Sequence, residues 1–303
     1  MKKVILSISA MLFVGVAAFA QVLPGTYSPN SSYVNQTGSS QDAYVNQIGT
    51  SQKSSVIQKN FKNEADVYQG VNPGQITLPI VGNISHDNLA MVSQDGKLNK
   101  AYISQNNWRN KAYQTQVGNE NEATIWQDET NIAYGLGFSG NLIGEDVATQ
   151  TQTGNHNKAT VDQGTSGNPV ASASVFTGML PLTTSISAKP HGSNEATQTQ
   201  TGNYNEAYTS QGGYNNSSSQ VQNASILASS ANKNVSNHYQ YGDNNIANVT
   251  QTGIKNLENV LQEGNGNKSY ATQNSTFPSS FAGNASVVIQ QGTLNLSTVA
   301  QSN

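Results

Sequence analysis

The side chains with the most regular spacing in this sequence are carboxamides. Glutamine recurs every eleven residues in six runs, which together hold nineteen units and begin at Gln36, Gln94, Gln152, Gln200, Gln240 and Gln290. A carboxamide carries both hydrogen-bond donors and an acceptor, so identical amides in a row can bond to one another. The first chemistry that this spacing indicates is therefore amide-to-amide hydrogen bonding.

Acid–base and metal-binding side chains are few and scattered. The chain has four histidines, none at metal-ligand spacing from another, and no cysteine. We interpret His86-Asp87 as a polar turn, and the carboxylates that recur in the repeats, such as Glu64 and Glu122, as solvated charge. Glycine-rich phosphate loops and calcium-type Asp repeats are absent from the sequence. We therefore expect no catalytic, metal-binding or cofactor-binding residues, and no enzyme.

The other positions of the eleven-residue unit keep phase with the glutamine, which we number position 0. Position −6 is Asn in sixteen units, the exceptions being Gln41, Gln52 and Asp146. Position −4 is Ala or Ser in eighteen, with Glu258 the only departure, and position −2 is Val or Ile in twelve. Position +2 is Gly in eleven. The constrained positions are thus two residues apart.

A spacing of two decides between the two structures that suit an eleven-residue period. A right-handed helical supercoil also has this period, but its apolar stripe would follow helical spacing. Alternation by two is typical of a strand with one face inward, and Gly and Asn between strands indicate turns. We therefore predict an all-β protein, a two-sheeted parallel β-solenoid in which strand–turn–strand rungs are built from two eleven-residue half-repeats.

Stacked rungs place identical residues of the repeat above one another. Side-chain amides can then bond along ladders, which satisfies polar groups that are costly to bury alone. We expect Ala or Ser at −4 to let the sheets approach and Val or Ile at −2 to form the dry contact. The residues predicted to form the core ladders are Asn99, Gln105, Asn110, Gln116, Asn121, Gln127, Asn194, Gln200, Asn205, Gln211, Asn245, Gln251, Asn256, Gln262, Asn295 and Gln301.

The first twenty residues differ from the rest and have the pattern of a secretory signal peptide. Lys2 and Lys3 precede an apolar run, and Ala18-Phe19-Ala20 matches a cleavage site before Gln21. Without those lysines, 12 of the 14 basic residues remain against 17 acidic ones, so the mature chain carries about −5. We expect a secreted protein that neither binds nucleic acid nor inserts into a membrane.

The phase of the repeat also predicts the domain organisation. We expect a signal peptide at 1–20, a short leader at 21–29 and a single solenoid domain at 30–303. Breaks in the period predict insertions near 71–87, 134–145, 165–193, 223–233 and 274–283. Such insertions are either ligand-binding loops or tolerated additions at rung edges. The first and last units match the repeat without a recognisable cap, which predicts end-to-end stacking.

At this point the pattern resembles a known family. The motif N-x-A-x3-Q-x-G-x2-N-x-A-x3-Q, as in Asn110 to Gln127 and Asn194 to Gln211, resembles the curlin repeat of curli subunits, and the resemblance extends from Asn30 to Gln301. It implies export to the periplasm of a Gram-negative bacterium and then, unfolded, through a dedicated outer-membrane pore with chaperones. It further implies assembly with itself, with other curli-type subunits or on a nucleator, into extracellular amyloid fibres of the biofilm matrix. The inward Asn and Gln ladders would form the fibre core.

The chain departs from the motif at several inward positions. Val at −2 is replaced by Gln114, Gln150, Gln198, Gln220 and His238. A second function remains open beside fibre formation, namely a monomeric adhesin or polysaccharide-binding surface protein. Its binding face would be the outward tyrosines at −3, for which cross-strand stacking is nevertheless the favoured explanation: Tyr33, Tyr44, Tyr102, Tyr113, Tyr208 and Tyr270.

Overall fold

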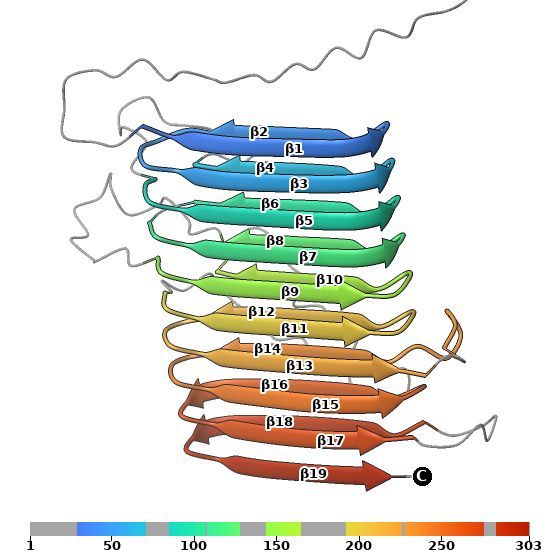
Figure 1. The fold of residues 1–303 in the computed structure, drawn as a ribbon. Coiled ribbons are helices and arrows are strands. Elements are labelled where there is room, and N and C mark those ends of the chain that lie inside the picture. Colours follow the sequence, from blue (N-terminus) through green and yellow to red (C-terminus); the bar gives the residue numbers. More distant parts are fainter. Residues whose placement is uncertain are drawn as a thin grey trace, which may run out of the picture.

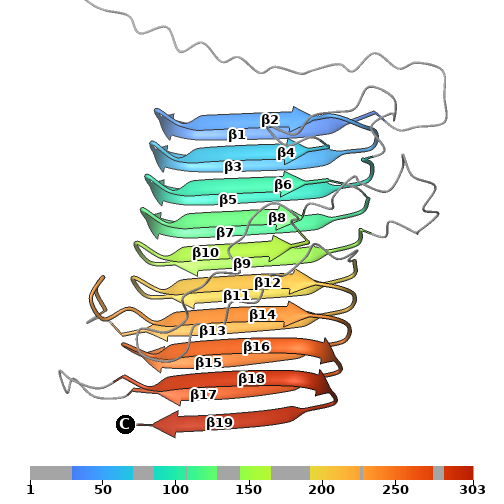
Figure 2. The ribbon, with the colours of Figure 1, turned by 180° about the vertical axis from the view of Figure 1, so that it is seen from behind.

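In the computed structural model the chain forms one stack of β-strands (Figure 1). The structure describes residues 29–70, 85–106, 108–127, 144–164, 192–225, 228–275 and 283–302. Successive strands alternate between two parallel sheets that lie face to face, and the view from behind shows the second sheet (Figure 2). Among these residues no helix occurs, and hence none long and apolar enough to cross a bilayer. The predicted two-sheeted parallel β-solenoid is confirmed.

The odd-numbered strands form the larger sheet, here called sheet A. Its ten strands are β1 (Ser31–Ser39), β3 (Lys53–Phe61), β5 (Leu89–Lys97), β7 (Lys111–Asn119), β9 (Val147–Thr153), β11 (Glu195–Thr201), β13 (Ser217–Ala224), β15 (Ile246–Gly253), β17 (Lys268–Asn274) and β19 (Leu296–Ser302).

The even-numbered strands form the second sheet, sheet B. Its nine strands are β2 (Asp42–Gln47), β4 (Glu64–Gln69), β6 (Lys100–Gln105), β8 (Glu122–Gln127), β10 (Lys158–Gln163), β12 (Glu206–Gly212), β14 (Val235–Tyr241), β16 (Leu257–Asn265) and β18 (Ala285–Thr293).

The pairing register follows the sequence phase without a slip. Each strand pairs in parallel with the next strand but one, so that Gln36 lies beside Gln58 and Gln47 beside Gln69. The same alignment holds across the gaps in the period, as for Gln163 beside Gln211. Burial alternates along the interior strands, because one face meets the other sheet and the other faces outward. Each predicted eleven-residue unit therefore corresponds to one strand and its turn.

The turns depend on two residues with positive φ. Gly118 at position +2 has φ of +116°, and a Cβ there would lie 1.9 Å from the carbonyl oxygen of Gly154 in the next rung. Glu120, two residues later, adopts the left-handed helical region with φ of 55°. Glycine is favoured at +2 because any side chain would meet the backbone of the neighbouring rung.

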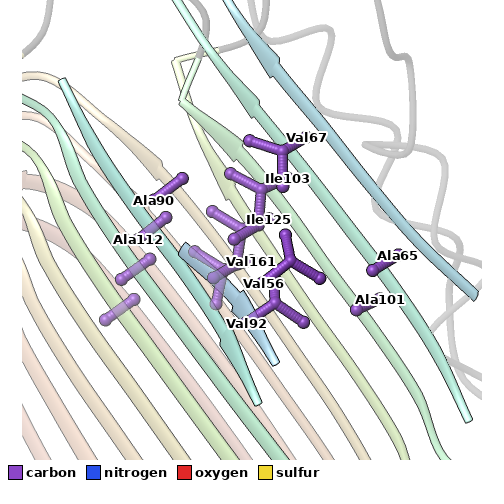
Figure 3. Close-up of a cluster of buried hydrophobic side chains, with 12 residues drawn as sticks. Val56, Ala65, Val67, Ala90, Val92, Ala101, Ile103, Ala112, Ile125 and Val161 are labelled. Atoms are coloured by element: carbon purple, nitrogen blue, oxygen red, sulfur yellow. The ribbon is translucent and has the colours of Figure 1, made fainter. Parts of the chain in front are cut away.

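A narrow apolar core lies between the sheets in the N-terminal half of the stack (Figure 3). Val67, Ile103 and Ile125 of sheet B face Val56 and Val92 of sheet A, and all five are at most 2% exposed. The alanines at −4, including Ala65, Ala90, Ala101 and Ala112, are buried alongside them. This arrangement confirms that positions −4 and −2 face inward and that Val and Ile at −2 form the dry contact.

The predicted insertions fall mostly outside the described residues, as do the predicted signal peptide and most of the leader. The strands that precede them are described. The first three insertions follow β4, β8 and β10 of sheet B, and the last two follow β13 and β17 of sheet A. The insertions therefore leave the stack at two opposite edges, with three on one and two on the other.

Candidate assembly site: the amide ladders

The glutamines at position 0 of sheet A form one continuous hydrogen-bonded ladder. In each step the Nε2 of one glutamine donates to the Oε1 of the glutamine on the next strand, over 2.8–2.9 Å. The order along the ladder is Gln36, Gln58, Gln94, Gln116, Gln152, Gln200, Gln222, Gln251, Gln273 and Gln301.

Sheet B carries a second ladder of the same kind. Its eight steps measure 2.8–3.0 Å and run through Gln47, Gln69, Gln105, Gln127, Gln163, Gln211, Gln240, Gln262 and Gln290. The two ladders contain every position-0 glutamine of the nineteen units. Both lie inside the stack, since the interior members are at most 1% exposed.

Each glutamine also ties the two sheets together. Gln116 of sheet A donates to the backbone oxygen of Lys100 in sheet B over 2.9 Å, and Gln127 of sheet B donates to that of Lys111 in sheet A over 3.1 Å. The same bond recurs along the stack. One buried amide thus bonds to a neighbouring glutamine along the stack and to a backbone group across the core, and each bond is worth about 1 kcal/mol net. Alanine at position 0 would leave those partners unsatisfied.

The ladders have a direction. Every step donates toward the C-terminal end, so Gln36 and Gln47 receive no ladder bond from the described strands. At the other end, Gln290 and Gln301 each use one N–H on a backbone oxygen of the facing sheet, at Lys268 and Ala285. The second amide N–H, which earlier glutamines donate to the next rung, has no further strand to reach among the described residues. Each glutamine ladder therefore ends in an acceptor at its N-terminal end and in a donor at its C-terminal end.

The predicted core residues occupy the positions expected for them. The glutamines lie in the ladders described above, and the asparagines stand just before each strand. Fourteen of the sixteen are at most 1% exposed, whereas Asn295 and Gln301, on the last strand, are half-buried.

The asparagines at −6 form the predicted amide ladder along sheet B and also make a bond that was not predicted. In each step of the ladder an Nδ2 donates to the Oδ1 one rung earlier, over 3.0–3.2 Å, along Asn99, Asn121, Asn157, Asn205, Asn234, Asn256 and Asn284. The additional bond recurs in both sheets and goes from a backbone N–H to the side-chain oxygen one rung earlier, as from Asn121 N to Asn99 Oδ1 at 3.0 Å. The Nδ2 of Asn99 donates to the carbonyl of Gly118, at 2.8 Å. Asparagine at −6 thus both builds a ladder and connects successive turns.

This bonding accounts for the exceptions at −6. Gln41, Gln52 and Asp146 all have a side-chain oxygen, and each accepts a backbone N–H from the next strand of its sheet: Asn63, Asn88 and Asn194, respectively. The position requires a carbonyl-type acceptor within reach, which Asp and Gln also supply.

The four glutamines that replace Val at −2 form a third ladder, which we did not predict. Gln114 donates to Gln150, Gln150 to Gln198 and Gln198 to Gln220, over 2.8–3.0 Å. All four are at most 1% exposed and lie on the consecutive strands β7, β9, β11 and β13. Gln114 begins the ladder, and its Oε1 has no hydrogen-bond partner. The four glutamines that depart from the motif thus supply hydrogen-bond partners for one another.

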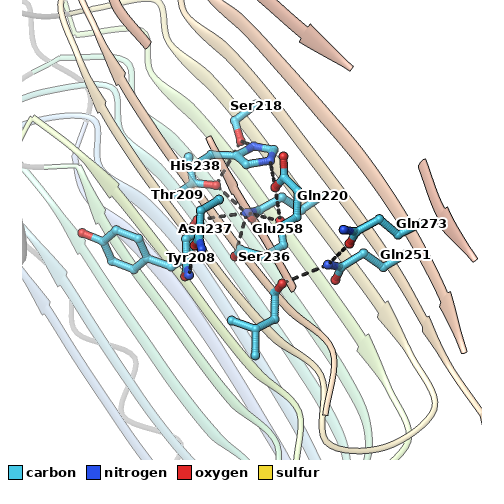
Figure 4. A network of polar contacts seen from close by, with 12 residues as sticks. Tyr208, Thr209, Ser218, Gln220, Ser236, Asn237, His238, Gln251, Glu258 and Gln273 are labelled. Atoms are coloured by element: carbon cyan, nitrogen blue, oxygen red, sulfur yellow. Dashed lines mark hydrogen bonds and ion pairs between the residues drawn. The ribbon is translucent and has the colours of Figure 1, made fainter. Parts of the chain in front are cut away.

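A second unpredicted cluster lies just below this ladder (Figure 4). His238 Nδ1 is 2.8 Å from Ser218 Oγ, and its Nε2 is 3.2 Å from Glu258 Oε2. Glu258 also accepts a bond of 3.2 Å from Ser236 Oγ. Ser218, His238 and Glu258 are each at most 1% exposed. The set has the residue types of a hydrolase triad, but a fully enclosed serine is out of reach of a substrate, so the cluster is structural.

The outer face of sheet B carries a column of aromatic rings. Tyr44 contacts Tyr68, Tyr68 contacts Tyr102 and Tyr102 contacts Trp126, with ring centroids 5.4, 5.6 and 6.1 Å apart. The predicted stacking of tyrosines therefore occurs, but the column alternates between positions −3 and −1. Aromatic pairs of this kind typically contribute about 0.5–1.5 kcal/mol of stability each, beyond the burial of their area.

Beside the aromatic column, charges alternate along position −5 of sheet B from Glu64 to Lys158, whereas Asp42 on the first strand lies beside Glu64. Glu64 faces Lys100 at 3.8 Å, and Glu122 faces Lys158 at 3.7 Å. Lys100 also lies beside Glu122 in the register. These exposed pairs are worth at most about 1 kcal/mol each. The carboxylates of Glu64 and Glu122 are half-exposed, as predicted for solvated charge, and each also lies near a lysine.

Several groups on this face have shifted acidities, among them Asp66 and Tyr239. Burial, followed by repulsion from Glu64 and Asp42, raises the pKa of the Asp66 carboxyl. Burial raises the pKa of the Tyr239 phenol to about 12. Both shifts favour the uncharged form in the folded stack.

The described residues hold no group of three or more His, Asp or Glu side chains suited to a metal ion. His86 and Asp87 lie 2.9 Å apart, with the imidazole stacked on Trp108, and take part in no larger acid–base cluster among those residues. No model of a known protein family matches the chain, and no curated protein matches it. The amide ladders and the two ends at which they stop are therefore the site from which we infer function.

Proposed function

We propose that the chain is a secreted structural subunit that polymerises end to end into curli-like amyloid fibres of an extracellular biofilm matrix. Its main partner is a further copy of itself, joined by other curli-type subunits or a nucleator. A Gram-negative outer-membrane pore and chaperones would deliver it unfolded. No cofactor, metal or catalysis is involved.

The observation that carries the proposal is the direction of the two glutamine ladders. A ladder that ends in acceptors at one face and in donors at the other is complementary to a second copy. Stacked parallel strands with identical side chains in register are the arrangement of cross-β fibres. The outermost strands are also exposed in the structure, Val34 to 45% and Leu296 to 70%. Pairing these strands with another copy would bury them.

Polymerisation of the mature chain, residues 21–303, tests the proposal. We expect the purified chain, freed from denaturant without any cofactor, to form fibres that give a meridional reflection at about 4.7–4.8 Å. A chain that stays folded and monomeric for days, without that reflection, would refute it.

The role of the ladders in assembly has its own test. Gln116→Ala together with Gln127→Ala should lengthen the lag before fibre growth, because it removes one member from each ladder. Thr115→Ala with Thr124→Ala changes outward positions on the same two strands and should leave the lag unchanged. Equal lag times for the two double variants would contradict ladder packing.

One observation favours a second function, a monomeric adhesin or polysaccharide-binding protein. The column of Tyr44, Tyr68, Tyr102 and Trp126 offers a row of aromatic rings on one outer face. Sugar rings pack on such surfaces through their apolar C–H faces. A glycan-binding assay on soluble chain, with Trp126→Ala as control, would separate this function from polymerisation.

A further inference from the structure

The number of strands fixes how a second copy fits on the first. Among the residues that the structure describes, the stack has nineteen strands, ten in sheet A and nine in sheet B. At the C-terminal end, β19 is therefore one half-rung beyond β18. A strand that continued the solenoid after β19 would lie in sheet B, on β18.

The first strand of a second copy has the residues needed for that place. Aligned by phase, Gln36 of β1 falls on Gln290 of β18, Val34 on Val288 and Gly38 on Gly292. Gly38 and Gly292 both have positive φ, so the turns also match. Both strands are nine residues long.

The second strand fits the other position equally well. Gln47 of β2 falls on Gln301 of β19, and Val45 falls on Val299. The donors of Gln290 and Gln301 then meet the acceptors of Gln36 and Gln47, which continues both ladders across the junction. Asp42 is the only charged residue on the four strands, and it meets Leu296, so no like charges face one another.

We propose that successive copies in the fibre are related by a rotation of about 180° about the fibre axis, with β1 on β18 and β2 on β19. This inference rests on the proposed assembly into fibres. Sheet A of one copy continues as sheet B of the next, because the two sheets run in opposite directions and a half-turn exchanges them. Nine and a half rungs at about 4.8 Å give a rise of about 46 Å per copy.

Stacking without rotation fails on geometry. If β1 were placed on β19, one strand position of sheet B would stay empty between β18 and the β2 of the next copy. Two strand edges would then expose unpaired backbone groups inside the fibre, which folded and assembled β-structures avoid. The sheet B glutamine ladder would also stop at every junction.

The half-turn has a consequence for the insertions. Three of them leave one edge of the stack and two leave the other. Rotation places the three-insertion edge of one copy above the two-insertion edge of the next. Averaged over successive copies, both sides of the fibre then carry the same number of insertions.

Cysteine cross-linking of the mature chain tests the rotation, since the chain has no cysteine of its own. In the rotated fibre, outward-facing Asn35 of one copy lies on Ile289 of its neighbour. Neighbouring parallel strands are about 4.8 Å apart, within the Cα separations of disulfides. Without rotation, Asn35 lies on Ala300. All three residues are exposed in the structure, so no core contact is changed.

The two pairings give opposite results. We expect mixed fibres of Asn35→Cys and Ile289→Cys chains to yield an oxidised dimer as the main cross-linked species. Mixed fibres of Asn35→Cys and Ala300→Cys should yield no more dimer than single-variant fibres. The reverse pattern would overturn the half-turn while leaving fibre formation intact. Absence of fibres in the unsubstituted chain would overturn the proposed function, and the inference with it.

Helical reconstruction of fibres from the unsubstituted chain provides an independent readout. A twist near 180° with a rise of about 46 Å is expected, from nine and a half rungs. A twist near zero per copy would refute the half-turn whatever the cross-linking shows.

Discussion

The buried pair of His238 and Glu258 allows a sharp test of how this core tolerates departures from its repeat. His238 stands where Val is usual and Glu258 where Ala or Ser is usual. Replacing either alone with the usual residue, by His238→Val or Glu258→Ala, restores the motif at one position. We nevertheless expect each single change to destabilise the stack, and the double change to be far better tolerated than the sum of the two.

The magnitudes follow from the contacts. His238→Val leaves the Glu258 carboxylate with one bond, from Ser236, in a site that is 0% exposed. Leaving a buried polar group without its partner typically lowers the free energy of unfolding by about 1–3 kcal/mol. Glu258→Ala leaves the imidazole Nε2 without its partner, a loss of similar size. The contact of Ser218 with Thr209, at 3.0 Å, involves neither substituted residue.

The double variant removes both polar groups together. Replacing both partners of a buried hydrogen bond by apolar residues can be nearly neutral or stabilising. We therefore expect its free energy of unfolding to lie within about 1 kcal/mol of the unsubstituted chain or above it. The coupling energy between the two positions is then at least about 1 kcal/mol, more than the ~0.3–0.5 kcal/mol within which independent sites add.

Guanidinium titration of freshly prepared monomer, followed by circular dichroism, measures the stability. Because long repeat stacks can unfold in parts, amide hydrogen exchange in β14 and β16 serves as the local readout. Thr250→Val, an exposed position on β15, is the control and should stay within about 0.5 kcal/mol. Additive effects, or a His238→Val variant as stable as the unsubstituted chain, would refute the reasoning.

Three further predictions concern acidity and the third ladder. Asp66→Asn should stabilise the stack at pH 7. Because the pKa of Asp66 is raised above 3.8, the stability that this carboxyl contributes is present at low pH and is lost as it ionises. Urea titrations should therefore show that the gain from Asp66→Asn vanishes in acid. Burial raises the pKa of Tyr239 to about 12, so the contribution of this phenol to stability should be constant below about pH 10 and fall between about pH 10 and pH 12. Tyr239→Phe should reduce this fall in an alkaline titration. Val92→Gln should be tolerated better than Ile125→Gln by more than about 1 kcal/mol in thermal melts, because only Val92 adjoins the unpaired Oε1 of Gln114.

The sequence was sufficient to predict the architecture because the repeat constrains both the alternation within each strand and the alignment between rungs. Spacing by two gave the inward face, and spacing by eleven gave the length of each unit. The glutamine ladders followed because position 0 is invariant within the units. The role of asparagine was only partly predicted. A column of identical residues does not reveal whether the side-chain oxygen accepts from an amide or from the backbone; the tolerated Asp146 was the one available hint.

The third ladder and the buried His238–Glu258 pair were missed for a different reason. Each departure was compared with the motif, whereas the relevant neighbour of an inward residue is the same position two units away. Read in this way, Gln114, Gln150, Gln198 and Gln220 all belong to odd-numbered units and adjoin one another. His238 and Glu258 belong to successive even-numbered units. The sequence contained this signal, but it can be recognised only when every second unit is compared.

The distribution of these departures bears on assembly. A polar residue at −2 is tolerated inside the stack because the chain itself supplies its partner on the adjoining strand. At either end the partner would have to come from another copy, so an unmatched Gln or His there would be buried alone at each junction, a loss of about 1–3 kcal/mol. Val34, Val45, Val288 and Val299, the −2 residues of the four outermost strands, are all apolar. The two ends thus keep apolar residues at −2, which need no hydrogen-bonding partner from another copy. The Gln and His replacements at −2 occur only on interior strands, where the same chain supplies their partners.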